Sequence, residues 1–280
     1  MKELFKNCLS VREESGWYKP FRFTKAQLEK YSTTIARSRA PSSVALSFRT
    51  AAKSIKIEYR IGLKARDWAS FDLTVDGALS DSVAVTDTEG FAEFTLPGDE
   101  SREISIYLPH LVEIEIKAPV ADAPLLPTEK NDRLWLALGD SITQGMVAKR
   151  PSSAYPSIVS SILDVEVINA GVGGIIFNVE ELDHIGREPD LITVALGCND
   201  WGRFEPSVFK ENVRAYLGKL YSLYTTRNIK IILPIWRSDE KEEKGGVDFP
   251  RHRQFIREVV CEFPEIEIID GYEQIGRAHV

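Results

Sequence analysis

The fold of the second half of the chain is decided by the stretch Leu134-Trp135-Leu136-Ala137-Leu138-Gly139-Asp140-Ser141-Ile142-Thr143-Gln144-Gly145. An apolar run of strand length ends abruptly in Gly-Asp-Ser, and an amphipathic segment of helical period follows at residues 154–163. The pattern predicts a buried strand with Ser141 at its carboxyl end. Ligands of open parallel sheets bind at that edge, because the connecting loops converge there. Ser141 is therefore a candidate nucleophile; the alternative is that it only caps the turn after the strand.

Length and composition limit the classes of protein to which the chain can belong. With 280 residues, of which 43% are apolar, it can bury a substantial core in one large domain or two smaller ones. A net charge of −7 argues against a nucleic-acid partner, because phosphate backbones are bound by clustered Lys and Arg. The cysteines Cys8, Cys198 and Cys261 are far apart and lack CxxC spacing. They predict free thiols and neither a disulfide framework nor a zinc site.

The N-terminal segment lacks the features of a targeting sequence. Residues 1–9 contain no continuous apolar stretch with a small-residue cleavage site, and no run in the chain approaches the roughly 18 apolar residues of a membrane span. From the sequence we expect a cytoplasmic protein without a membrane partner. The sequence leaves the oligomeric state open.

The first half of the chain alternates apolar and polar residues with the period of two that half-buried strands require. Turn residues such as Asp76-Gly77 and Pro97-Gly98-Asp99 separate these runs. Short strands at this spacing predict an antiparallel β-sandwich of jelly-roll type, which we place at residues 1–120. The predicted strands are 44–50, 54–61, 70–75, 92–96, 103–108 and 112–116.

Four ring-bearing residues of this region admit two interpretations. Trp68, Phe71, Tyr107 and His110 could form a sugar-binding aromatic face. Packing in a core or an interface is the more frequent fate of such side chains, and we favour it. His110 in particular is expected to be a hydrogen-bonded structural histidine.

A change in the residue pattern marks the predicted domain boundary. Residues 118–127 are spaced by prolines and lack periodicity, and we place a linker at residues 121–131. Beyond it, apolar strands alternate with helical segments, which predicts a flavodoxin-like three-layer α/β/α domain with a parallel sheet at residues 132–274. Right-handed crossovers bring the carboxyl ends of its strands to one edge. After the strand that precedes Ser141, the predicted strands are 165–169, 191–196, 229–234 and 266–269, and the predicted helices are 154–163, 206–226 and 248–262.

Three successive strands of this domain end in loops that together suit acyl transfer. The first loop is Gly139-Asp140-Ser141, the second is residues 169–174, and the third is Gly197-Cys198-Asn199-Asp200. Acyl transfer needs a hydroxyl that attacks a carbonyl and preset donors around the oxygen that becomes negative. A glycine lets its N–H approach that oxygen without a Cβ in the way, and an asparagine amide is a neutral donor. We predict that the three loops meet at one point.

Each loop taken alone also has a purely structural interpretation. Gly171, Gly173 and Gly174 can form a tight turn between a strand and a helix. Asn199 can make an Asx turn, and Asp200 can cap the segment that follows. A phosphate-binding function is disfavoured, because the glycines lack GxGxxG spacing and no P-loop Gly-Lys-Ser/Thr is present. The presence of all three loops at one sheet edge is what favours a catalytic site.

From residue 134 to about residue 270 the chain resembles the SGNH (GDSL-type) hydrolase superfamily. The four sequence blocks of that superfamily centre on a nucleophilic Ser, an oxyanion Gly, an oxyanion Asn and an Asp-x-x-His pair, and the three loops are similar to the first three blocks in order. The resemblance implies that Ser141 is the nucleophile and that its own N–H is one oxyanion donor. It assigns the other two donors to Gly174 and Asn199, although the neighbouring Gly173 leaves a one-residue ambiguity.

The same resemblance implies supporting roles for Gly139, Asp140 and Asp200, and it implies no metal or organic cofactor. A preceding β-sandwich recurs in members that remove acyl groups from carbohydrates, which fits the two-domain layout. The resemblance is close over about half of the chain. For the N-terminal half it rests on architecture alone.

The fourth block, an Asp-x-x-His that follows the last strand and supplies the general base, is not found in the sequence. Residues 275–280 resemble the translation of a sequencing adapter. We therefore expect a C-terminally truncated chain that ends in a non-native tail.

The other histidines are poor substitutes for this base. His279 lies on the suspect tail, without an Asp three residues before it, and His252 and His184 stand at the wrong offset from their neighbouring carboxylates. We expect His252 to pack against the fold or lie at the surface. Without a base Ser141 would be a weak nucleophile, so we expect little activity from this chain.

The sequence as a whole predicts a serine esterase that hydrolyses short acyl esters, with acetyl groups on a carbohydrate as the expected substrate. A lysophospholipase or thioesterase is one alternative, which a deep apolar groove beside Ser141 would favour. A carbohydrate-binding protein that keeps the fold without catalysis is the other. Trp201 and Phe204 after the third loop, and Trp236 and Arg237 after the fourth strand, are candidate cleft residues, with packing beneath the loops as their alternative.

Overall fold

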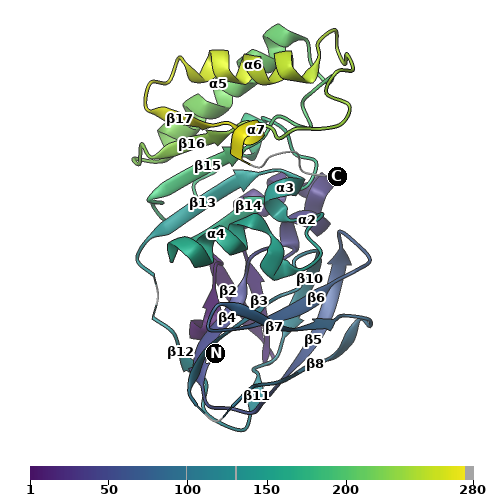
Figure 1. The fold of residues 1–280 in the computed structure, drawn as a ribbon, viewed down its shortest axis with the longest axis vertical. Coiled ribbons are helices and arrows are strands. Elements are labelled where there is room, and N and C mark those ends of the chain that lie inside the picture. The colour runs from purple at the N-terminus through teal and green to yellow at the C-terminus, as the bar shows by residue number, and fades with distance from the viewer. Residues whose placement is uncertain (99, 130, 275–280) are drawn as a thin grey trace.

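The computed structural model describes residues 1–98, 100–129 and 131–274, and it has two parts stacked along the long axis of the molecule (Figure 1). The first part contains two antiparallel sheets in a sandwich-like arrangement, as the alternating sequence predicts. One sheet has the order β1 (Phe5–Lys6), β4 (Ala45–Thr50), β9 (Arg102–Tyr107), β6 (Ser70–Val75) and β7 (Ala78–Ala84), with β12 (Leu126–Pro127) also paired to β4. The other has the order β11 (Val120–Ala121), β5 (Ser54–Lys64), β10 (Val112–Ile116), β3 (Trp17–Phe21) and β2 (Ser10–Glu14), with β8 (Glu89–Thr95) also paired to β5.

The two antiparallel sheets share one hydrophobic core. Phe48 and Ile106 on the first sheet and Ile57 and Ile114 on the second are at most 1% exposed and belong to the same buried cluster. Alternate residues of each strand therefore point into the space between the sheets, because successive side chains of a strand lie on opposite faces. Burial of this apolar surface stabilises the sandwich.

The segment between β3 and β4 is helical, which the sequence analysis did not predict. It contains α1 (Lys25–Lys30), the 3-10 turn η2 (Ser32–Thr34) and α2 (Ile35–Arg39). Thr24 and Gln27 form a capping box at the start of α1. Phe23 and Tyr31 belong to the buried cluster of the α/β part of the molecule, so this N-terminal segment packs against the second half of the chain. The division into domains at residues 121–131 stays a prediction.

The second part is a parallel five-stranded sheet with the flavodoxin-like order 2-1-3-4-5, which confirms the predicted α/β fold. Gly139 at the end of β13 (Leu134–Gly139) pairs with Gly171 on one side and Ala195 on the other, so these three strands end at the same level. The strands are, in sheet order, β14 (Glu166–Gly171), β13 (Leu134–Gly139), β15 (Leu191–Ala195), β16 (Ile229–Ile232) and β17 (Ile266–Ile269).

Helices pack on both faces of this sheet. Leu136 and Val194 face the larger buried cluster, which includes residues of α5 (Pro206–Leu223) and α6 (Phe249–Val260). Trp135 and Ala137 face the other side, where Tyr155 and Val159 of α4 (Tyr155–Leu163) cover them. The remaining short helices are α3 (Ser141–Gln144), α7 (Gly271–Gln274), η1 (Lys2–Leu4), η3 (Pro151–Ser153) and η4 (Val179–Glu181).

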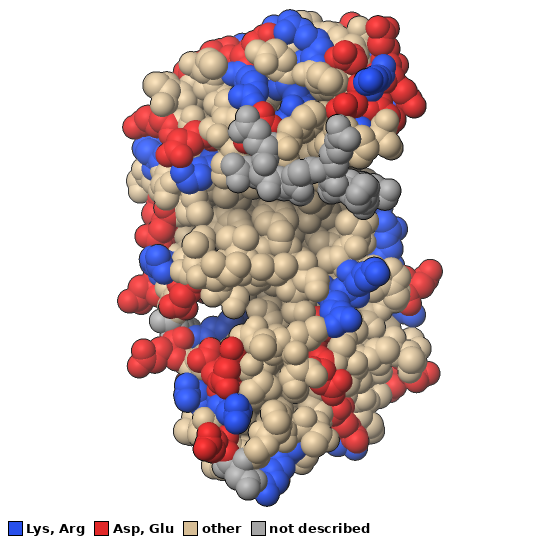
Figure 2. All heavy atoms as spheres, in the orientation of Figure 1, with Lys and Arg blue, Asp and Glu red and all other residues tan. Residues whose placement is uncertain are grey.

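The face that carries α4 is poor in charge. Residues 155–163 include no charged side chain, and Figure 2 shows a broad uncharged zone across the middle of this face, with charged residues gathered toward both ends of the molecule. Ile162 of α4 is 75% exposed. In the part of the chain that the structure describes, no helix is both long enough and apolar enough to cross a bilayer.

Candidate active site

Ser141 lies where β13 gives way to α3, at the carboxyl edge of the parallel sheet. The Asp140 side chain accepts a hydrogen bond from the Ile142 N–H at 2.9 Å and so caps the first turn of α3. Gly145 ends the helix in the left-handed conformation, at φ +85°. The strand, the cap and the short helix therefore hold Ser141 at the edge, where its side chain is half-buried.

Hydrogen bonds between backbones join the three predicted loops. The Val172 N–H donates to the Gly139 carbonyl at 2.9 Å, and the Asp140 N–H donates to the Ala195 carbonyl at 3.3 Å. The first loop is thus tied to the second on one side and to the end of β15, which precedes the third loop, on the other. Neighbouring strands that end at one level allow these contacts, so the loops carrying Ser141, Gly174 and Asn199 lie side by side.

The two adjacent glycines of the second loop differ in what their N–H groups do. The Gly173 N–H donates to Gln144 Oε1 at 2.7 Å. The Gly174 N–H has no hydrogen-bond partner in the described part of the chain, and Gly174 adopts φ +85°. Gly174 therefore has the free donor of the pair, which bears on the one-residue ambiguity that the sequence left. The sequence analysis did not predict the role of Gln144 in this loop, because a glutamine carries no local signal of the loop that it will contact.

Asn199 bridges the first and second loops. Its Nδ2 donates to the Ile175 carbonyl at 3.0 Å and approaches Asp140 Oδ2 at 3.4 Å. The second of these hydrogen bonds is long and correspondingly weak. The amide of Asn199 is thus held beside Asp140, and one of its two hydrogens is only loosely engaged.

The first and third loops each contain a buried carboxyl group. Asp140 is 2% exposed and Asp200 is 1% exposed, and burial raises the pKa of Asp140 to about 6 and that of Asp200 to about 7. Asp200 Oδ1 accepts the Phe177 N–H at 3.0 Å, whereas its Oδ2 has no hydrogen-bond partner among the described residues. The raised pKa values bring the charge change of Asp140 and Asp200 close to neutral pH, next to Ser141 and Asn199.

Three histidines lie in the described part of the chain, and each is engaged in a structural contact. His252 Nε2 lies 2.9 Å from the Gly197 carbonyl oxygen, and burial lowers its pKa to about 4. His110 is fully buried with Nε2 2.9 Å from the Gly145 carbonyl oxygen, as the structural interpretation predicts. His184 stacks on Tyr224 at 4.9 Å between ring centroids. His279 lies outside the described residues, and none of the described histidines forms a hydrogen bond with Ser141.

The aromatic candidates divide into core and surface residues. Phe71 and His110 are completely buried, so the hypothesis of a sugar-binding face that includes them is wrong; their rings fill the core and the interface between the two parts. Trp68 is 41% exposed and meets the His110 ring edge-on at 5.7 Å. Tyr107 lines a pocket at the amino edge of the parallel sheet, which is described below.

Trp201 and Arg237 pack together beneath the third loop. Trp201 is 6% exposed, and its Nε1 donates to the Val247 carbonyl at 2.9 Å. The Arg237 guanidinium lies 5.0 Å from the Trp201 ring and pairs with Asp239. The packing interpretation therefore holds for Trp201. Phe204 and Trp236 are half-buried.

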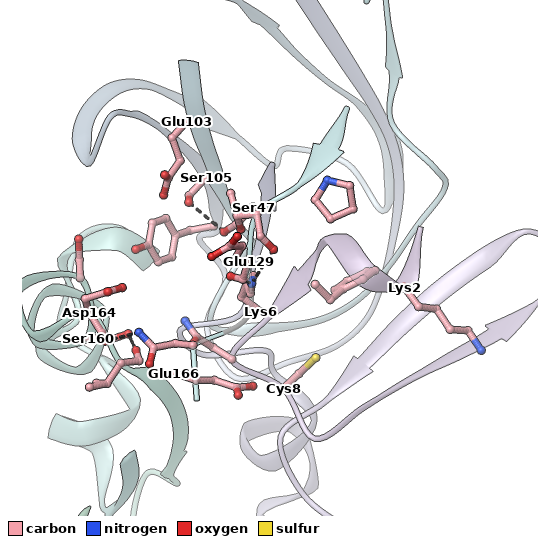
Figure 3. Close-up of a pocket in the computed structure, with 18 of the residues that line it drawn as sticks. Lys2, Lys6, Cys8, Ser47, Glu103, Ser105, Glu129, Ser160, Asp164 and Glu166 are labelled. Atoms are coloured by element: carbon pink, nitrogen blue, oxygen red, sulfur yellow. Dashed lines mark hydrogen bonds between the residues drawn. The ribbon is translucent and has the colours of Figure 1, made fainter. Parts of the chain in front are cut away.

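A pocket of about 1180 Å³ lies between the sandwich and the parallel sheet, and Figure 3 shows its lining. Ser47 and Ser105 of the first sheet face it, 2.9 Å apart between their hydroxyl oxygens, opposite Asp164 and Glu166. Glu166 begins β14, whereas the catalytic candidates follow the carboxyl ends of the strands. This pocket is therefore at the edge of the sheet opposite Ser141. The described residues form no group of His, Cys, Asp and Glu able to hold a metal ion.

Residues 137–273 match the model of the GDSL-like lipase/acylhydrolase family. This part of the chain is a GDSL-like acylhydrolase domain. The match begins in β13 and spans the three loops, so the family assignment rests on the region in which the candidate residues lie. The family places the protein among hydrolases that act on ester bonds.

Solved structures share the fold of the whole chain, sandwich included. A salicylyl-acyltransferase from a tetracycline biosynthetic pathway superposes with a TM-score of 0.81 at 18% identity, over 99% of this chain and 84% of that one. A GDSL-like lipase from Bacteroides ovatus gives 0.74 at 19% identity, over 96% and 85% of the two chains. A family two carbohydrate esterase from Clostridium thermocellum gives 0.66 at 14% identity, over 91% and 88%. The search of curated proteins gave no match.

Proposed function

We propose that this protein is a serine esterase that removes short acyl groups, with acetyl esters of carbohydrates as its substrate class. The observation that supports the proposal is that the loops of Ser141, Gly174 and Asn199 adjoin at the carboxyl edge of the sheet. These loops carry a hydroxyl, a glycine N–H without a partner among the described residues, and an asparagine amide. This set of groups is what acyl transfer through a covalent intermediate requires.

In the proposed mechanism Ser141 Oγ attacks the ester carbonyl. The oxygen that becomes negative accepts hydrogen bonds from the N–H groups of Ser141 and Gly174 and from Asn199 Nδ2. Asn199 gives up its weak 3.4 Å contact with Asp140 for this purpose. The acyl-enzyme forms as the alcohol leaves, and water then attacks the same carbonyl to release the acid and regenerate the Ser141 hydroxyl.

The proton of Ser141 needs a general base. In this proposal the base is the histidine of the family's Asp-x-x-His block, which residues 1–274 do not contain. His110 and His252 are not assigned this role, because burial lowers the pKa of each to about 4 and each already contacts a backbone carbonyl. A base with so low a pKa would also be a weak proton acceptor.

The carbohydrate assignment is supported by the two-part architecture. The family two carbohydrate esterase from Clostridium thermocellum aligns over 91% of this chain, so it shares the sandwich as well as the catalytic fold. Trp201, which could have lined an acyl or a sugar pocket, is packed under the third loop instead.

The test uses the protein expressed from the complete gene and compares p-nitrophenyl acetate, p-nitrophenyl palmitate and acetylated xylan as substrates. We expect turnover of the acetyl esters, little turnover of the palmitate, and loss of at least about 10³-fold in kcat for Ser141→Ala. Equal turnover by the wild type and Ser141→Ala would remove Ser141 from the mechanism. A preference for palmitate would favour the lipase alternative, and oligosaccharide binding without any turnover would favour the non-catalytic one.

A further inference from the structure

Two arginines from the N-terminal half of the chain lie behind the second loop. Arg22 follows β3 and Arg37 lies on α2, and they reach the end of β14 across 149 and 136 residues of sequence respectively. Figure 1 shows α2 next to α3, beside the carboxyl end of β14. No carboxylate among the described residues forms an ion pair with either guanidinium. Both side chains instead donate to backbone carbonyls.

Arg37, Gln144 and Gly173 form a closed ring of three hydrogen bonds. The Gly173 N–H donates to Gln144 Oε1 at 2.7 Å, Gln144 Nε2 donates to the Arg37 carbonyl at 2.9 Å, and Arg37 Nη1 donates to the Gly173 carbonyl at 2.6 Å. Gln144 is completely buried. Both polar groups of the Gly173 backbone are thus held from outside the loop.

The contact with the Gly173 carbonyl decides where the Gly174 N–H points. A trans peptide is planar, and its C=O and the following N–H point in opposite directions. Because Arg37 Nη1 binds the Gly173 carbonyl at one edge of this peptide unit, the Gly174 N–H must point from the opposite edge, away from the guanidinium. That N–H is the donor with no partner in the described part of the chain.

Arg22 fixes the position of the segment that carries Arg37. It is 2% exposed; its Nε donates to the Ala40 carbonyl at 2.6 Å, and its Nη2 donates to the Arg37 carbonyl at 3.0 Å. Its Nη1 donates to the carbonyls of Gly171, at 3.1 Å, and Asn169. Carbonyl acceptors satisfy a buried guanidinium without a counter-ion, although burial lowers its pKa to about 9.

The glycines of the loop leave the space that Arg37 occupies. A Cβ at Gly174 would lie 2.7 Å from Arg37 Nη1, and one at Gly173 would collide with Met146 Sδ. The arginine and the glycine pair are therefore sterically matched.

We propose that Arg37 is a positioning residue for the oxyanion hole: it orients the Gly173–Gly174 peptide so that the Gly174 N–H faces the substrate carbonyl. Gln144 and Arg22 fix the position of Arg37 relative to the loop. This inference rests on the proposed function, and it makes the N-terminal half of the chain part of the catalytic apparatus without giving it any contact with the substrate.

The kinetic test compares Arg37→Ala and Arg37→Lys with Arg39→Ala in the protein expressed from the complete gene. Arg39 is an arginine on the same helix. Its Nη1 pairs with Glu113 Oε1 at a distance of 3.3 Å, and in the described part of the chain it forms no hydrogen bond with the second loop. We expect Arg37→Ala to lower kcat about 100-fold, because a mispositioned donor acts like a missing one, with KM changed less than about threefold. Affinity for a trifluoromethyl ketone, which mimics the tetrahedral intermediate, should fall in proportion to kcat/KM. Arg37→Lys should keep part of the wild-type kcat, and added guanidinium should restore part of kcat in Arg37→Ala. Arg39→Ala should match the wild type.

Two kinetic outcomes would overturn the proposal. One is a kcat within about twofold of wild type in an Arg37→Ala protein that keeps its thermal midpoint. The other is a raised KM at unchanged kcat, since that result would put Arg37 in contact with the substrate. If Arg37→Ala fails to fold, the split between kcat and KM in Arg37→Lys carries the same test.

A second measurement does not depend on catalysis. In protein labelled with ¹⁵N-glycine, Arg37→Ala should shift the amide resonances of Gly173 and Gly174 and speed exchange of the Gly173 amide hydrogen. Resonances that stay in place would overturn the positioning role even in an active esterase. Should Ser141→Ala retain full activity while these resonances move, the proposed function fails and the structural contact stands.

Discussion

His252 Nε2 lies 2.9 Å from the carbonyl oxygen of Gly197, and this contact ties α6 to the first residue of the loop that carries Asn199. The imidazole stacks on Phe209 with ring centroids 4.1 Å apart. Burial lowers the His252 pKa from 6.5 to about 4, so the ring is neutral at pH 7 and its Nε2–H donates to the carbonyl. His252 is thus a structural residue of the third loop.

This pKa predicts acid sensitivity. The unfolded chain binds the His252 proton at about pH 6.5, whereas the folded protein binds it only near pH 4, so the stability that neutral His252 contributes is present above pH 6.5 and lost as the pH falls through this window. His252→Gln keeps a donor and does not titrate. We expect the free energy of unfolding of the variant to fall less steeply between pH 6.5 and 4, by up to about 1.4 kcal/mol per pH unit.

Urea unfolding at pH 7, 6, 5 and 4.5 measures this difference. Parallel curves for the wild type and His252→Gln would contradict the assignment.

The parts of the fold that the sequence predicts well are those with long periodic patterns. The parallel strands and helices α4, α5 and α6 start within about two residues of their predicted positions. Helices α1 and α2 were missed because, at six and five residues, they are too short to display a period and depend on tertiary packing. The β2–β3 hairpin was missed because β2 lies at the surface and carries a charged stretch, Arg12-Glu13-Glu14, that lacks an apolar alternation.

For the site, the sequence could predict which loops converge, but it could not predict the hydrogen-bond partner of each polar group in them. The order of the strands follows from the alternation of strands and helices, and it brings the loops of Ser141, Gly174 and Asn199 to one edge. Which glycine keeps a free N–H depends on the Gln144 side chain, and the burial of Arg22 depends on carbonyls as far as 149 residues away. Neither partnership leaves a local pattern in the sequence.

Gly174→Ala should impair catalysis more than stability. Gly174 has φ +85°, a conformation that costs an L-residue roughly 1–2 kcal/mol, and its new Cβ would lie 2.7 Å from Arg37 Nη1. We expect kcat to fall by about 10²-fold or more as the donor is displaced, which steady-state kinetics on p-nitrophenyl acetate can measure.

Gly186→Ala separates backbone strain from site disruption. Gly186 has φ +81° and nothing within 4 Å of an added Cβ, so it bears the same strain without the collision. Its thermal midpoint should drop by a similar amount while kcat stays unchanged. Equal kcat values for the two variants would show that Gly174 has no special place in the reaction.

Asp200→Asn should gain stability relative to the wild type as the pH rises. Burial raises the Asp200 pKa from 3.8 to about 7, so the stability linked to its protonated form is complete below pH 4 and is lost as the pH rises toward and through 7. Asparagine keeps an oxygen for the Phe177 N–H and carries no charge at any pH. The free energy of unfolding of the variant minus that of the wild type should therefore increase between pH 5 and pH 8.

Urea unfolding at these two pH values provides the measurement, with Asp67→Asn, at an exposed position, as the control. A difference that is independent of pH would mean that Asp200 is ionised throughout and would remove it as a titrating group beside Asn199.

Asp72 should be the strongest single polar link between the sandwich and the α/β part. It is fully buried on β6; its Oδ2 accepts the Ser152 N–H at 3.0 Å and the Ser152 hydroxyl at 2.5 Å, and its Oδ1 accepts the Ser82 hydroxyl at 2.7 Å. Asp72→Ala leaves three donors unpaired, and hydrogen bonds to a charged group contribute about 1.5–3 kcal/mol each, so we expect a loss of at least about 3 kcal/mol in the free energy of unfolding. Asp81→Ala, on the exposed strand β7, should cost less than about 0.5 kcal/mol. Chemical denaturation of both variants makes the comparison, and equal small losses would mean that the interface is held by its apolar contacts alone.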